Sequence, residues 1–215
     1  MKNVHKKTAQ PKFGQMLMIE QLVGLTAELQ KVRTHPPLVM RSEGKYEGGI
    51  LGFVKGLRLS ARVIYFLRER LSSTDLKVDW GHLVDSSDES LSPECDVIIH
   101  EKGHLRKWNG SEESIMDFRF VQAGSVRAII SCKSSLASID KSYPKTLKKF
   151  GVKTVFLFAE CCAEDAFSRL RKEAKAAGYR DLCCLYFTQK NNGTFKTDEK
   201  MYVAFGRAVV SAVTK

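Results

Sequence analysis

The chain has 215 residues, of which 43% are hydrophobic and 27% are charged, a composition that supports a sizeable core and argues against a disordered chain. Its apolar runs stay well short of the roughly 18 residues that a membrane span needs, which argues against a membrane protein. The formal net charge of +11 favours a polyanionic partner, with nucleic acid ahead of a membrane surface.

We expect residues 1–40 to form a basic arm and a first helix, and residues 41–215 to form the main domain. The arm lacks the apolar segment of a signal peptide, so we expect a cytoplasmic protein. Apolar residues at helical spacing predict a helix over 13–33, and a second helix is expected over 48–71.

Short apolar runs bounded by turn residues then predict extended segments. They cover residues 77–85, 95–100, 116–124 and 125–133.

Helices and strands alternate in the second half of the chain. The predicted elements are a helix over 134–151 with a break at Pro144, a strand over 152–160, a helix over 162–178, a strand over 180–189 and a helix over 198–215. This order predicts an α/β fold whose mixed β-sheet is flanked by helices, with an N-terminal helical extension. Many chemistries use such sheets, so the fold alone does not give the function.

Two short stretches combine apolar strands with charged ends. In "SPECDVIIH", Glu94 and Asp96 open a strand, and in "AIISCK", Lys133 closes one. Side chains alternate along a strand, so Ser131 and Lys133 share a face while Cys132 points to the other. If the two strands are neighbours, an acid and a lysine converge at one edge of the sheet.

Such a pair suits the hydrolysis of a phosphodiester bond. A divalent metal polarises the phosphate and lowers the pKa of a water molecule, and Mg²⁺ takes one or two carboxylates with other oxygen ligands. A lysine beside the metal can orient or deprotonate the water and offset charge in the transition state.

At these residues the chain resembles the PD-(D/E)XK phosphodiesterases, the restriction-endonuclease-like superfamily. Asp96 matches the first acid of that motif and Lys133 its lysine, and the resemblance spans roughly residues 46–187. It implies Mg²⁺ or Mn²⁺ as cofactor, a catalytic set of Glu94, Asp96, Ser131 and Lys133, and metal ligation by Asp96 and Glu47.

The chain departs from the family at Ser131, which stands where the family has Asp or Glu. Two interpretations stay open: another acid completes the site, or the catalytic activity is lost. The candidate donors are Glu47, Glu94, Glu101 and Asp140.

The leading hypothesis is therefore a metal-dependent endonuclease acting on DNA, in restriction or phage defence, with RNA also open as substrate and a homodimer or a partner protein as the assembly. The alternative is an inactive nuclease-like domain that binds nucleic acid or serves as an assembly subunit. The expected contacts to nucleic-acid phosphates are Arg58, Arg62, Lys141, Lys145, Lys148 and Lys149.

Overall fold

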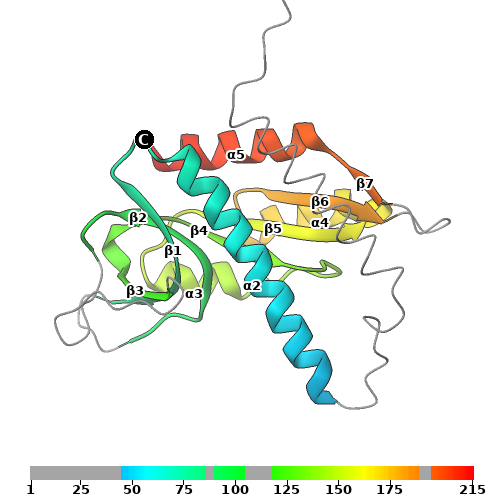
Figure 1. Cartoon of the computed structure of the whole chain (residues 1–215), viewed down its shortest axis with the longest axis horizontal. Coiled ribbons are helices and arrows are strands. Elements are labelled where there is room, and N and C mark those ends of the chain that lie inside the picture. Colours follow the sequence, from blue (N-terminus) through cyan, green and yellow to red (C-terminus); the bar gives the residue numbers. More distant parts are fainter. Residues whose placement is uncertain (1–44, 86–89, 105–117, 189–194) are drawn as a thin grey trace, which may run out of the picture. The chain divides into compact units, whose positions relative to one another are not determined.

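The computed structural model describes residues 45–85, 90–104, 118–188 and 195–215 (Figure 1). Residues 46–215 form one unit of the chain. The basic arm and the first helix predicted over 1–40 lie outside the described residues, so that division of the chain stays a prediction.

Seven strands and four helices follow one another in the described residues, with the labels of Figure 1. They are α2 (Lys45–Arg70), β1 (Leu76–Val84), β2 (Cys95–Glu101), β3 (Phe118–Gln122), β4 (Val126–Lys133), α3 (Tyr143–Lys149), β5 (Val155–Ala163), α4 (Glu164–Ala177), β6 (Leu182–Thr188), β7 (Phe195–Thr197) and α5 (Glu199–Val213). None of the described helices is long and apolar enough to cross a membrane.

The strands form one sheet in the order β3-β1-β2-β4-β5-β6-β7. The pairs β1–β2, β2–β4 and β6–β7 are antiparallel, whereas β1–β3, β4–β5 and β5–β6 are parallel. The predicted mixed sheet is thus confirmed.

Helices cover both faces of this sheet. On one face, Phe66 of α2 packs on Tyr202 of α5 with ring centroids 4.9 Å apart, and Phe158 of β5 contacts the same tyrosine. On the other face, Leu147 of α3 and Leu170 of α4 are fully buried in a cluster with residues of the central strands. Because β4 and β5 lie between these two layers, their middle residues are almost entirely apolar.

The helix predicted over 134–151 is wrong in its first half, because only Tyr143–Lys149 is helical. The carboxylate of Asp140 accepts hydrogen bonds from the backbone N–H of Ser142 and of Tyr143, at 2.9 and 3.2 Å. Such bonds compete with a helix and favour its start, and Pro144 fits the first turn, where no N–H partner is needed. Pro144 therefore opens the helix and does not break it.

Two further differences concern the strands. Strand β5 continues to Ala163, beyond the predicted end at Glu160, because its residues 161–163 pair with residues 186–188 of β6. The short edge strand β7 was not predicted, since three residues are too few for a pattern.

Candidate active site at the start of β2 and the end of β4

The predicted convergence of an acid and a lysine lies where β2 begins and β4 ends. These strands are antiparallel neighbours, and the pairing of Val97 with Ile130 puts Asp96 across from Ser131. Lys133 follows two residues later, exposed at the last position of β4. The structure therefore brings together side chains that stand more than 30 residues apart in the sequence.

Asp96 is held by β4 through one of its carboxylate oxygens. Its Oδ2 accepts a hydrogen bond from the backbone N–H of Cys132 at 2.8 Å and a long one from Ser131 Oγ at 3.5 Å. Burial raises the pKa of Asp96 above its ordinary value, and the Cys132 N–H and the positive charge of Lys133 oppose this only in part. The fold thus keeps a carboxylate that is costly to ionise.

Three charged groups act on Asp96 or on one another. Lys133 favours the ionised form of Asp96, whereas the exposed Glu94 raises the pKa of Asp96 by repulsion. The pKa of Asp140, just before α3, is lowered mainly by the hydrogen bond from the Ser142 hydroxyl, and the charge of Lys133 adds to this effect. A site with one lysine and several acids around it has the charge pattern that a metal ion and a phosphate would complete.

Ser131 and Cys132 face opposite sides, as the alternation along β4 predicts. Ser131 is only 2% exposed and lies beside Asp96, while the Cys132 thiol interacts with Ser60 of α2. Burial raises the pKa of Cys132 well above its usual value, which leaves it protonated and unsuited to act as a nucleophile. Ser131 therefore touches the site without contributing charge.

Sequence reasoning missed Tyr143, the first residue of α3. Its hydroxyl donates to the carbonyl of Glu94 at 3.3 Å, which ties α3 to the residues just before β2. The long-range contact left no signal in the sequence, because the helix was expected to start nine residues earlier.

The other predicted site residues, both acids and phosphate contacts, fall into three groups. Glu101 ion-pairs with Arg127 at the far end of β2, so it does not reach Asp96 and is corrected as a candidate for completing the site. Arg62 is half-buried on α2, and Lys141, Lys145, Lys148 and Lys149 are exposed along α3 and just before it. Glu47 and Arg58 belong to α2, but their side chains lie outside what the structure describes.

The other end of β2 carries a different arrangement. Asp79 of β1 accepts one hydrogen bond from Arg68 at 2.9 Å and pairs with the fully buried His100 at 2.9 Å. A cavity of about 630 Å³ opens beside them. Its cationic lining residues are Arg68, Lys77, Lys102 and Arg119.

The donor set at Asp96 fits Mg²⁺ or Mn²⁺ better than zinc. The described residues contain no group of three or more His, Cys, Asp or Glu side chains arranged to hold a metal. Asp96 and Glu94 offer one or two carboxylates, which is the share of ligands that proteins commonly give to Mg²⁺ when phosphate and water supply the rest. All six cysteines are free, and five of them are buried.

Comparison with solved structures finds similar folds in NucC. The cAAA-bound form of Escherichia coli MS115-1 NucC has a TM-score of 0.55 at 12% identity, covering 96% of this chain and 93% of that one. The cAAA-bound form of Pseudomonas aeruginosa ATCC27853 NucC has a TM-score of 0.56 at 14% identity, covering 96% and 92%.

At this level of identity the likeness concerns the fold. The chain has the restriction-endonuclease-like fold that its sequence motif predicts. No protein-family model matches the sequence, and no curated protein matches it.

Proposed function

We propose that the protein is a metal-dependent nuclease that hydrolyses phosphodiester bonds in DNA, in phage defence. The observation that carries the proposal is that Asp96, near the start of β2, and Lys133, at the end of the paired strand β4, lie at the same edge of the sheet. The fold is similar to that of NucC, a nuclease of phage defence, and this likeness supports the same class of reaction.

In this proposal each residue has a separate task. Asp96, with Glu94 or Glu47, would hold Mg²⁺ or Mn²⁺, and the Cys132 N–H fixes the carboxylate in the strand register. The bound metal would polarise the phosphate and lower the pKa of a water molecule. Lys133 would orient that water and offset the negative charge that develops on the phosphate. Ser131 would donate a hydrogen bond to Asp96 and keep it in place.

The basic residues around the site would hold the substrate backbone. Contacts to phosphates give affinity without sequence preference, and Lys and Arg supply most of them. The exposed lysines of α3 start within a few residues of Tyr143, which itself contacts Glu94. The proposed set is Arg58, Arg62, Lys141, Lys145, Lys148 and Lys149.

The reaction is tested by incubating the protein with plasmid DNA and with a structured RNA, with Mg²⁺, with Mn²⁺ and with EDTA. The proposal expects metal-dependent cutting of DNA that EDTA abolishes. Cutting that persists in EDTA, or cutting of RNA alone, would contradict it. Light scattering of the same sample distinguishes a homodimer from a monomer that needs a partner protein.

Ser131 favours a second candidate function, a nuclease-like domain that binds nucleic acid without cutting it. The buried hydroxyl stands where the family has its second acid, and a neutral hydroxyl is a poor ligand for Mg²⁺. Calorimetric titration with Mn²⁺ separates the two candidates. Millimolar or tighter binding that Asp96→Asn abolishes supports the nuclease, whereas salt-sensitive DNA binding without metal binding supports the inactive domain.

The Ser131→Glu variant sharpens this choice because it restores the acid-x-lysine pattern. If the second acid is missing, the variant gains metal affinity and cutting activity. If another acid already completes the site, the added charge beside Asp96 gives no gain in activity, since like charges disfavour each other's ionised forms.

The cavity at the far end of β2 favours a ligand-controlled nuclease. Four cationic side chains line it, and two NucC structures of similar fold are cAAA-bound forms. We propose that the cavity takes up an anionic ligand of this kind. Titration with cAAA and with inorganic phosphate tests it, using Lys77→Gln and Lys102→Gln, whose side chains are exposed. Binding that the paired substitution does not weaken would contradict the assignment.

A further inference from the structure

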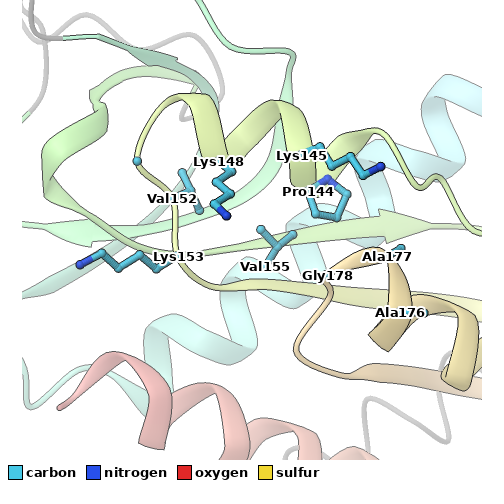
Figure 2. Close-up of a pocket in the computed structure, with 10 residues that line it drawn as sticks. Pro144, Lys145, Lys148, Val152, Lys153, Val155, Ala176, Ala177 and Gly178 are labelled. Atoms are coloured by element: carbon cyan, nitrogen blue, oxygen red, sulfur yellow. The ribbon is translucent and has the colours of Figure 1, made fainter.

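A second cavity, of about 620 Å³, lies between α3, the turn that follows it and the end of α4 (Figure 2). Pro144, Val152, Val155 and Ala177 give it an apolar floor. Three exposed lysines, Lys145, Lys148 and Lys153, line it, and no acidic side chain does. The cavity therefore combines apolar surface with positive charge that is not offset from within.

The three lysines are spread along this groove. Figure 2 shows Lys145 and Lys153 on opposite sides of the view, with Lys148 between them above Val155. Several separated cations suit a ligand whose negative charges repeat along its length better than they suit one small anion.

The groove is connected to the candidate active site through the start of α3. Tyr143 donates to the carbonyl of Glu94, and the next residue, Pro144, lines the groove. On the other side, the hydroxyl of Tyr179 donates to the carbonyl of Asp140 at 3.1 Å, and the preceding Gly178 also lines it. Pro144 and Gly178 of the groove are thus each next in sequence to a tyrosine whose hydroxyl contacts the backbone of Glu94 or Asp140.

We infer that this groove binds the sugar–phosphate backbone of the substrate strand beside the scissile phosphate. The inference rests on the proposed nuclease function and makes it more specific. It divides the lysine run that the sequence singles out: Lys145 and Lys148 line the groove, whereas Lys141 and Lys149 do not. It also adds Lys153, which precedes β5 and was not among the expected contacts.

The test compares two variants that lose the same charge. One carries Lys145→Gln, Lys148→Gln and Lys153→Gln, and the control carries Lys200→Gln, Arg207→Gln and Lys215→Gln, three exposed positions that do not line the groove. Both are made with Asp96→Asn so that DNA is bound without being cut. Fluorescence anisotropy then gives the affinity for a labelled duplex between about 50 and 200 mM salt.

The slope of log affinity against log salt is negative, and each lost phosphate contact makes it shallower by about 0.9. We expect the groove variant to lose about two to three units of slope and the control less than about one. Equal slopes for the two variants overturn the inference. A lower melting temperature with an unchanged slope also overturns it, because the lysines would then serve only the carboxyl ends of α3 and α4.

Cleavage assays on the unsubstituted protein and on the groove and control variants with Asp96 intact distinguish this inference from the proposed function. If the chain with all its native residues does not cut DNA but the slopes differ, the groove stands and the nuclease proposal fails. If it cuts DNA and the slopes are equal, the nuclease stands and the groove fails. Competition by polyglutamate as strong as that by DNA would also overturn the choice of a nucleic-acid strand.

Discussion

Two aspartates, Asp79 of β1 and Asp96 of the neighbouring β2, show how the same side chain is used in two ways. Asp79 has two strong partners, Arg68 and His100, whereas Asp96 has one short hydrogen bond, from the backbone N–H of Cys132. Burial by itself favours the neutral form of both carboxyls and so acts to raise both pKa values. At Asp79 the hydrogen bonds and charges of His100 and Arg68 outweigh burial and lower the pKa, while at Asp96 burial prevails.

The difference indicates which carboxylate is structural and which is available for chemistry. A buried acid whose partners are all within the protein is compensated and has little left to offer a ligand. An acid that burial leaves under-compensated gains most from a metal ion, which would supply the missing positive charge. We therefore propose that Asp79 serves stability and Asp96 serves function, and four predictions test this proposal.

The largest expected effect is on cleavage. Asp96→Asn and Lys133→Met should each lower the rate of DNA cutting by about 100-fold or more, since each removes a charge that acts on the reacting phosphate. Initial rates on plasmid DNA measure the loss, with circular dichroism to show that the fold is kept. Lys172→Gln is the control, and rates within a few-fold of it would contradict the assignment.

The second prediction concerns stability at the other end of β2. Asp79→Asn should destabilise the protein by about 3 kcal/mol, because it leaves Arg68 and the buried His100 without their common anion. Urea unfolding measures the free energy. Glu173→Gln, which breaks the exposed ion pair with Arg169, is the matched control and should cost less than about 1 kcal/mol. Equal losses of unfolding free energy in the two variants would show that the contacts of Asp79 stabilise the fold no more than an exposed ion pair does.

The third prediction is the pH dependence of that cost. Because the pKa of Asp79 is lowered in the folded state, its stabilising effect is present above the unfolded pKa of about 4 and is lost as pH falls through the folded value. The difference in unfolding free energy between Asp79→Asn and the unsubstituted protein should therefore be full at neutral pH and shrink below about pH 4. A constant difference down to pH 3 would contradict it.

The smallest effect has the opposite sign. Asp96→Asn should stabilise the protein by about 1 kcal/mol at neutral pH while abolishing activity, since the amide can still accept from Cys132 and no longer has to ionise in a buried place. Because the pKa of Asp96 is raised in the folded state, its ionisation costs stability as pH rises through that pKa, and the gain from the substitution should vanish in acid. Thermal unfolding at pH 7 measures it, and a fall in melting temperature would refute the contrast.

Local patterns in the sequence predicted most of the fold and the positions of Asp96 and Lys133 at the candidate site. The apolar run before Lys133 indicated β4, and the alternation along it placed Ser131 and Lys133 on one face. The Asp79–His100 pair was not foreseen, since its members lie 21 residues apart and meet only through the pairing of β1 with β2. The start of α3 was misplaced because a side chain, Asp140, and not periodicity, decides where that helix begins.

The central claim is that Asp96 is a metal ligand, and a crystal structure with Mn²⁺ and a short DNA duplex tests it most directly. The account predicts a metal ion about 2.0–2.2 Å from an oxygen of Asp96, with the phosphate on its open side and Lys133 beside it. The same map would identify the second acid. A metal bound away from Asp96, or DNA bound at this site with no metal at saturating Mn²⁺, would contradict the claim.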